Sequence, residues 1–321
     1  MTCHTGPVRI DLHTHSTASD GTDSPTELVQ AAVRADVDVL AITDHDTTAG
    51  WAEAAAALPS GLRLVRGMEM SCEGRDEDGR PVAVHLLAYL FDPTAREFAN
   101  ERERLRGERV ARLRAMATKM AADGLPIDFD AVMADAGQVV GRPHLARALV
   151  EAGVVSSVDE AFAGPLSVRS PYYVEKEDTP LERAVEMVNA AGGVSVIAHA
   201  RARSRGRLVA LDSIRELADR GLAGLEVDHP DHGGSDVDLL RSLATELDLI
   251  VTGSSDYHGT NKTIELGQYT TAPESFDAIV ARASGVPVLS APPGDAMTVE
   301  DGTAVEDGTT QEATGDLRRI R

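Results

Sequence analysis

Short apolar runs alternate with amphipathic stretches along most of the chain. Seven apolar runs predict buried β-strands, at residues 8–12, 37–43, 62–65, 82–90, 194–198, 224–227 and 249–252. Helical patterns separate most of these runs, at residues 24–35, 51–58, 180–191, 213–220 and 235–247. Such an alternation of strands and helices is typical of a parallel sheet with helical crossovers. The pattern therefore predicts an α/β fold.

This alternation breaks in the middle of the chain. Residues 95–122 form one long helical stretch rich in Arg, Glu and Ala, and shorter helices are predicted at 130–136, 144–152 and 158–162. We interpret residues 91–180 as an all-helical insertion that lies as a lid over the active site. The α/β domain would then be discontinuous, with parts at 8–90 and 181–290. Residues 291–321 are acidic and nearly free of apolar residues, which predicts a disordered tail.

Charge and cysteine content narrow the function classes. The 321 residues carry a formal net charge of -21, and such a surface repels polyanions, so binding to duplex DNA is not expected. A phosphate substrate would need bound metals or a local cluster of Arg residues. Two cysteines are too few for a disulfide scaffold, and no apolar run approaches transmembrane length. We expect a cytoplasmic protein without a membrane association or an obligate protein partner.

Histidines and acids gather on or just after the predicted strands. His13 and His15 lie two residues apart after the first strand, so both side chains point to the same side. Six of the ten histidines belong to this set, which consists of His13, His15, Asp20, His45, Glu69, His85, His199, Asp256 and His258. A lone strand histidine is usually an ordinary core residue. Recurrence at several strand ends instead favours a metal site.

The chemistry of these ligands points to particular metals. Imidazole nitrogens with a few carboxylates suit Mn, Fe or Zn and do not suit Ca or Mg. Nine ligands exceed what one ion of four to six ligands needs, so two or three divalent cations are implied. A carboxylate such as Glu69 would bridge a pair. Centres with several metals commonly clamp phosphoryl groups and activate water.

Several of these stretches together resemble the PHP (polymerase and histidinol phosphatase) superfamily. The likeness covers residues 8–290 and rests on Asp11-Leu12-His13-Thr14-His15-Ser16, Ile42-Thr43-Asp44-His45-Asp46, Gly67-Met68-Glu69, Ala198-His199 and Ser255-Asp256-Tyr257-His258-Gly259. The resemblance implies a distorted seven-stranded (β/α) barrel with a trinuclear metal site. It also implies a metal-dependent phosphoric ester hydrolase that contains Mn, with Fe or Zn as alternatives.

The resemblance also implies how the ligands are shared. The first metal would be held by His13, His15, Glu69 and Asp256. The second would be held by Glu69, His85 and His199. The third would be held by Asp20, His45 and His258. Spacing alone yields only the list of ligands.

The insertion resembles one subgroup, the nucleotide phosphoesterases. Gly141-Arg142-Pro143-His144 and the preceding Arg-rich helix carry this likeness. Members of the subgroup remove the 3′-phosphate from nucleoside 3′,5′-bisphosphates, and some trim short RNA from its 5′ end. The subgroup usually has Pro after the histidine of its third motif, whereas Ala200 follows His199 here.

Further residues are candidates for contacts with the substrate. Arg106 and Arg109 are candidate clamps for a second phosphate, although pairing with neighbouring Glu residues would explain them equally well. Arg142 and His144 are candidate phosphate ligands and catalytic residues, with helix capping as the alternative. His229 and His232 are candidate substrate contacts that could supply the general acid. The arginines at 201, 203, 205 and 207 fit a surface turn as well as a phosphate contact.

These observations combine into one hypothesis. The chain would hydrolyse phosphate monoesters of nucleotides by attack of a metal-activated hydroxide, and the favoured target is the 3′-phosphate of nucleoside 3′,5′-bisphosphates. Asp20, Arg142 and His144 would be the catalytic residues beside the metals. Alternatives are a 5′→3′ exoribonuclease on short RNA and a phosphatase of the histidinol-phosphate type. A metal-dependent binding or regulatory module is the alternative outside the enzymes.

Overall fold

A computed structural model describes residues 6–135 and 140–291 of the chain. The tail that the sequence predicts to be disordered lies, apart from residue 291, outside the described residues. Within the described ranges, no helix is both long and apolar enough to cross a membrane.

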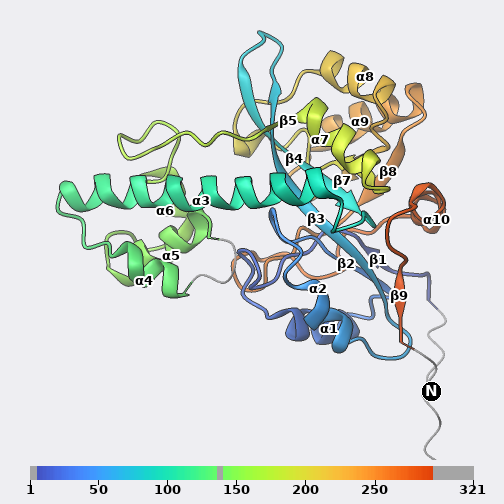
Figure 1. Ribbon diagram of the computed structural model, residues 1–321, viewed down its shortest axis with the longest axis horizontal. Helices are drawn as coiled ribbons and strands as arrows, with labels where there is room; N and C mark the ends of the chain where they lie inside the picture. The colour runs from blue at the N-terminus through green and yellow to red at the C-terminus, as the bar shows by residue number, and fades with distance from the viewer. Residues whose placement is uncertain (1–5, 136–139, 292–321) are drawn as a thin grey trace, which may run out of the picture.

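Seven strands form a sheet that curls into a nearly closed barrel (Figure 1). In spatial order they are β1 (Ile10–Asp11), β2 (Val39–Ile42), β3 (Arg63–Arg75), β4 (Pro81–Tyr89), β6 (Val194–Ile197), β7 (Gly224–Asp228) and β8 (Ile250–Gly253). Two short strands, β5 (Thr179–Pro180) and β9 (Leu289–Ser290), pair with β3. Just beyond β1 and β8, the His15 N–H donates to the Tyr257 carbonyl at 2.8 Å. The seven-stranded barrel expected from the resemblance is therefore confirmed.

The strand β4 corrects the expectation of a parallel sheet. It runs antiparallel to both β3 and β6, whereas the pairs β1–β2, β2–β3, β6–β7 and β7–β8 are parallel. The link between β3 and β4 is the turn at residues 76–80, which is too short for the crossover that a parallel pair needs. The predicted strand at 62–65 is also too short, because β3 continues through Glu69 to residue 75.

Six helices belong to the barrel domain. They are α1 (Pro25–Arg34), α2 (Trp51–Ala56), α7 (Leu181–Ala190), α8 (Leu211–Asp219), α9 (Gly234–Glu246) and α10 (Pro273–Arg282), and α10 was not predicted from the sequence. The first begins at a capping box, in which the Ser24 hydroxyl accepts from the Glu27 N–H and Glu27 accepts in return. Apolar side chains of these helices, such as Leu28 and Leu240, join the buried core against the sheet.

Four helices lie between β4 and β5 in the sequence. These are α3 (Arg96–Ala122), α4 (Phe129–Asp135), α5 (Arg142–Glu151) and α6 (Val158–Ala163). Figure 1 shows α3 extending away from the barrel, with the other three beside its far half. Its first half contributes Phe98 and Leu105 to the barrel's core, while Leu113 and Met120 belong to a separate cluster with α5. One long helix therefore joins the barrel to a small helical core.

Candidate metal centre

The nine predicted metal ligands converge at one end of the barrel. Loops after β1, β2, β6 and β8 carry seven of them, and Glu69 in β3 and His85 in β4 complete the set. All but His85 are buried. The ends of four strands thus bring together residues that are up to 245 positions apart in the sequence, from His13 to His258.

Four ligand atoms form the most compact group. His13 Nε2 lies 3.1 Å from His15 Nε2, and Glu69 Oε2 lies 3.3 and 3.1 Å from these two nitrogens. Asp256 Oδ1 is 3.4 Å from each nitrogen. Four ligands placed tetrahedrally about 2.0–2.1 Å from one ion would be roughly 3.4 Å apart. The group implied for the first metal therefore has the dimensions of a metal site.

The carboxylate of Glu69 faces different histidines with its two oxygens. Oε1 lies 2.7 Å from His85 Nδ1 and 2.9 Å from His199 Nε2, whereas Oε2 faces His13 and His15. Oε2 also lies 3.1 Å from His45 Nδ1, a buried atom that has no well-aligned hydrogen bond. A carboxylate with ligands on both sides suits a bridge between two cations.

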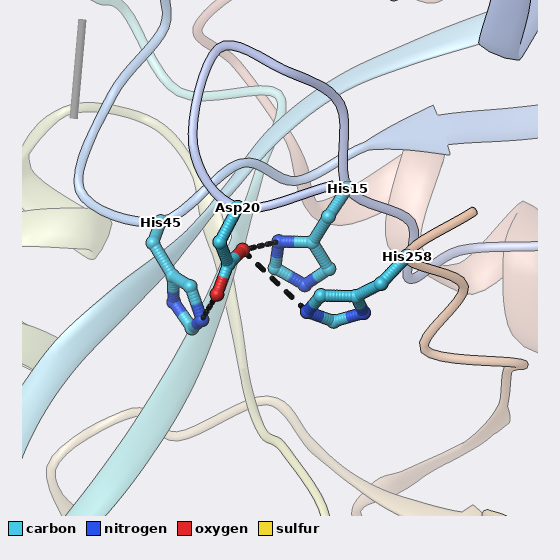
Figure 2. A group of neighbouring side chains, drawn as sticks. All are labelled: His15, Asp20, His45 and His258. Atoms are coloured by element: carbon cyan, nitrogen blue, oxygen red, sulfur yellow. Dashed lines mark ion pairs between the residues drawn. The ribbon is translucent and has the colours of Figure 1, made fainter. Parts of the chain in front are cut away.

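A second compact group surrounds Asp20 (Figure 2). Its Oδ1 lies 3.6 Å from His15 Nδ1 and 3.5 Å from His258 Nε2, and its Oδ2 lies 3.7 Å from His45 Nε2. His258 Nδ1 lies 2.8 Å from the Asp256 carbonyl, so this nitrogen donates and Nε2 presents its lone pair to Asp20. A lone pair that faces a carboxylate needs a cation between them. His15 Nδ1 also lies beside the three residues implied for the third metal, whereas its Nε2 faces the first group.

The group implied for the second metal is less regular. His45, Glu69 and His85 have ligand atoms within reach of one another. His199 Nε2 lies 2.9 Å from Glu69 Oε1, and its ring lies edge-on to the His85 ring. The Nε2 atom of His199 also lies 3.0 Å from the Arg205 guanidinium. His199 therefore has two competing neighbours, a carboxylate and a cation.

Protonation in this centre follows from burial and neighbouring charge. Burial alone would raise the pKa of Glu69, but the surrounding imidazoles, His85 foremost, outweigh burial and hold the pKa well below its usual range. Burial lowers the pKa of His45 to about 3, despite Glu69 nearby. An ionised carboxylate and a neutral imidazole are the forms that bind metals.

Glu226 was missed by sequence reasoning, although it supports two ligands. Its Oε1 lies 3.0 Å from His13 Nδ1, and its Oε2 accepts from the His199 backbone N–H at 2.9 Å. A carboxylate on Nδ1 fixes the ring and leaves Nε2 to face the centre. The available signal was an acid inside the apolar run at residues 224–227, at a position that is fully buried in β7.

Asp44 builds the loop that carries Asp20. It accepts hydrogen bonds from the Ser16 N–H at 2.8 Å and from the hydroxyls of Ser16 and Ser19 at 2.7 Å each. The loop returns so closely that a Cβ at Gly21 would lie 2.5 Å from the His15 carbonyl oxygen. Glycine is therefore required immediately after Asp20.

Three residues at the centre have left-handed backbone conformations. The φ angles are +32° at His199, +54° at Asp256 and +52° at Asp46, which follows His45. Such angles are uncommon outside glycine and often mark functional sites. The local backbone is thus bent to aim two of the candidate ligands.

The arginines predicted as phosphate clamps on α3 have different environments. Arg109 is largely buried, and it donates from Nε to Asp46 at 2.5 Å and from Nη2 to the Ser71 hydroxyl at 2.8 Å. Arg106 instead pairs with Glu103 at 3.2 Å on a more exposed face. Arg109 is thus the one of the two that reaches the edge of the metal centre.

The candidates on α5 also differ from each other. The Nδ1 atom of His144 accepts from the Gly141 N–H at 3.1 Å, which is the capping role considered as its alternative. The Arg142 guanidinium lies over the Phe162 ring, 5.4 Å from its centroid, and 3.5 Å from the Leu166 carbonyl. Arg142 therefore remains the residue with more hydrogen-bonding capacity for an anion.

His229 and His232 follow β7, and only His229 faces the metal centre. His229 Nδ1 accepts from the Asp231 N–H, and its Nε2 lies 3.4 Å from Asp256 Oδ2. His232 donates from Nδ1 to the Val227 carbonyl, and its Nε2 accepts from the Arg201 N–H. Backbone groups thus engage both ring nitrogens of His232.

Known proteins of similar sequence and fold were identified by comparison. The PHP domain family matches residues 11–127. A 3′,5′-nucleoside bisphosphate phosphatase from Chromobacterium violaceum is 34% identical over 78% of this chain and 87% of its own length. A 5′–3′ exoribonuclease from Haemophilus influenzae is 36% identical over 81% of this chain and 93% of its own length.

The solved structure of a Bifidobacterium adolescentis protein is also similar to this chain, and that protein is described as a metal-dependent phosphoesterase by inference. It superposes with a TM-score of 0.80 at 35% identity, over 87% of this chain and 98% of the other. These relatives match 78–87% of this chain, which is far more than the metal-binding motifs alone. The chain therefore belongs to the PHP domain family and is a metal-dependent phosphoesterase.

Proposed function

We propose that this phosphoesterase removes the 3′-phosphate from nucleoside 3′,5′-bisphosphates. The observation that carries the proposal is a surplus of partly buried positive charge beside the metal centre. Four cations from α3, α5 and the segment before β5 form what we term the cationic cluster, namely Arg109, Arg112, Arg142 and Lys176. A substrate with two phosphates could place one at the metal centre and the other here.

The cationic cluster has more positive than negative charge. Within the described ranges, its ion pairs involve two carboxylates, Asp46 with Arg109 and Asp178 with Lys176. Arg112 donates to the Val174 carbonyl at 2.8 Å, and Arg142 lies near a carbonyl and aromatic rings. Among the described residues, Arg112 and Arg142 therefore have no carboxylate within ion-pair distance, in a protein whose net charge is -21.

The pKa values report the cost of gathering these cations. Burial, followed by the like charges of Arg112 and Arg109, lowers the pKa of Arg142 to about 10. Burial, followed by the charge of Arg109, lowers the pKa of Lys176. An anion bound among these groups would offset both effects, and arginine forks match phosphate oxygens well.

Arg109 connects the cationic cluster to the metal centre. It binds Asp46, the residue after His45, and its Nη1 lies 3.5 Å from the position that a Cβ would take on Gly141 at the start of α5. The helices between β4 and β5 would then act as a lid that supplies the second phosphate site. This arrangement supports a substrate with two phosphates on one nucleoside.

We further propose two or three divalent cations in the metal centre, with Mn favoured over Fe and Zn. The mixture of imidazoles and carboxylates fits these ions, as does the unmatched lone pair of His258 that faces Asp20. When bound, such ions would lower the pKa of a coordinated water and neutralise phosphoryl charge. Around them, Glu226 orients His13 and His199, and Asp44 positions the Asp20 loop.

The test compares two substrates that differ by one phosphate. The Mn-loaded full chain should release inorganic phosphate from adenosine 3′,5′-bisphosphate. Adenosine 3′-monophosphate, which lacks the 5′-phosphate, should react with a kcat/KM roughly 10- to 100-fold lower, since charged hydrogen bonds to that phosphate are lost. Equal rates on both would contradict a second phosphate site, and no release from either would contradict the substrate class.

The exoribonuclease alternative uses the same cationic cluster. The 5′-phosphate of a short RNA could bind there, with the first phosphodiester at the metal centre, and the Haemophilus influenzae relative named as an exoribonuclease favours this possibility. Short RNAs of two to five nucleotides with a 5′-phosphate distinguish the two activities. A kcat/KM above that for the bisphosphate would favour the exoribonuclease.

A further inference from the structure

Arg205 lies among the candidate metal ligands, and the sequence left open whether it belongs to a surface turn or contacts phosphate. We propose that Arg205 binds the reacting phosphate over the metal centre, and that its guanidinium competes with a metal for the Nε2 atom of His199. This inference rests on the phosphoesterase activity but not on which nucleotide is the substrate.

Arg205 is the inward-facing member of a run of alternating arginines after β6. Arg201 and Arg203 lie against Asp236 on α9, at 3.6 and 2.6 Å. Arg207 donates to the Pro81 carbonyl on β4 at 2.7 Å. The short 3-10 helix at Arg203–Arg205 turns Arg205 the other way, toward His199 and Asp256.

No single protonation state of His199 Nε2 gives a favourable contact with both of its neighbours. Its Nε2 atom lies 2.9 Å from Glu69 Oε1 and 3.0 Å from Arg205 Nη1. A proton on Nε2 would suit the carboxylate but oppose the guanidinium, and a lone pair there would do the reverse. A metal ion beside Nε2 and the carboxylate would satisfy both ligands, and Arg205 would then have to release His199.

Asp256 would remain neutralised when Arg205 moves. Its Oδ2 lies 2.7 Å from Arg205 Nη2 and 2.6 Å from Lys262 Nζ, so two cations share one carboxylate oxygen. Loss of the Arg205 contact leaves Lys262 in place. The release of Arg205 therefore leaves no buried carboxylate without a partner.

An anchor keeps Arg205 at the centre after that release. Its Nε donates to Asp231 Oδ2 at 2.8 Å, and its Nη2 lies 2.8 Å from the same oxygen. The side chain is 35% exposed, so it borders the opening of the site. The Nη atoms released from His199 and Asp256 would still lie beside the metal centre. A guanidinium fork in this position matches two oxygens of a phosphoryl group.

The test measures binding of Mn²⁺ and of inorganic phosphate by calorimetry, on the full chain stripped of metal by chelation. Arg205→Ala should bind Mn²⁺ at least as tightly as the natural chain, because a competitor for His199 is removed. Its Mn-loaded form should bind inorganic phosphate roughly 10- to 100-fold more weakly. Arg205→Lys, which keeps the charge but loses the fork, should be intermediate in phosphate binding.

Arg203→Ala is the matched control, because Arg203 lies in the same turn and pairs with α9. It should leave both affinities unchanged. Weaker Mn²⁺ binding in both Arg205 variants would show that Arg205 only supports the ligands, and an unchanged phosphate affinity would show that it does not contact phosphate. Either result overturns the proposal. Because the probe is inorganic phosphate, both outcomes are independent of whether a nucleoside bisphosphate is the substrate.

Discussion

At the scale of single residues, the two ring nitrogens of His13 have separate roles. Glu226 lies 3.0 Å from Nδ1, and the metal-ligand group lies around Nε2. The negative charge of Glu226 raises the basicity of the ring that it holds. Glu226 is fully buried and also bonds the backbone of His199, so it supports two candidate ligands from one position.

The first prediction concerns this support. Glu226→Gln keeps the shape of the side chain but removes its charge, so Mn²⁺ affinity should fall roughly 10- to 100-fold. Calorimetry with the stripped protein measures the affinity, and activity at saturating Mn²⁺ should recover in part. Asp228→Asn is the control, since Asp228 lies on the same strand and pairs with Arg241 at the surface. Equal affinities in the two variants would show that Glu226 does not support the metal ligands.

At the scale of elements, α3 presents different environments along one helix. Arg112 lies over the Tyr173 ring, 4.9 Å from its centroid, and belongs to the cationic cluster. Arg114, two residues later, lies over the Phe129 ring on an exposed face. The two side chains offer a matched pair on the same helix, one inside the proposed phosphate site and one outside it.

The second prediction uses this pair. Arg112→Gln should raise the KM for adenosine 3′,5′-bisphosphate roughly tenfold, because one charged contact to the second phosphate is lost. Its kcat/KM for adenosine 3′-monophosphate should hardly change, since that substrate has no phosphate at the cationic cluster. Arg114→Gln should leave both substrates unaffected. Steady-state kinetics on the two substrates measure this, and equal losses on both would count against the second site.

The sequence predicted most elements, and the nine residues that it predicted as metal ligands do lie together at one end of the barrel. Strand ends carry strong signals, because apolar runs stop at polar residues such as His45 and Asp256. The antiparallel course of β4 was missed, because an apolar run does not reveal whether its strand is parallel or antiparallel to its neighbours. Glu226 was missed because one acid inside a strand does not reveal which side it faces. Arg205 turns inward while its neighbours Arg201 and Arg203 pair with Asp236, and only the tertiary structure shows this pairing.

At the scale of the whole molecule, the metal centre lies across the seam of the barrel. The strands β1 and β8 meet there through the His15–Tyr257 hydrogen bond and a single bridge between Thr14 and Tyr257. His13 and His15 come from one side of the seam, and Asp256 and His258 come from the other. Ions bound by both sides would therefore cross-link the two ends of the sheet.

The third prediction follows from this cross-link. At a Mn²⁺ concentration about 100 times its Kd, binding should stabilise the fold by about 2.7 kcal/mol. For a domain of this size, that corresponds to a Tm about 4–5 °C above that of the chelated protein, measured by calorimetric scans. Ca²⁺, which prefers sites made of oxygens alone, should have a smaller effect. A Tm that does not respond to Mn²⁺ would argue against ions bridging the seam.

The left-handed backbone at His199 and Asp256 also limits which metals could be introduced by redesign. With φ angles of +32° and +54°, these positions favour glycine and the few side chains enriched in that conformation, chiefly Asn, Asp and His. A cysteine ligand for softer metals would carry a backbone penalty at either position, whereas His13 or His85 would allow it without one. Attempts to change the metal preference of the centre should therefore begin on β4 and at the end of β1.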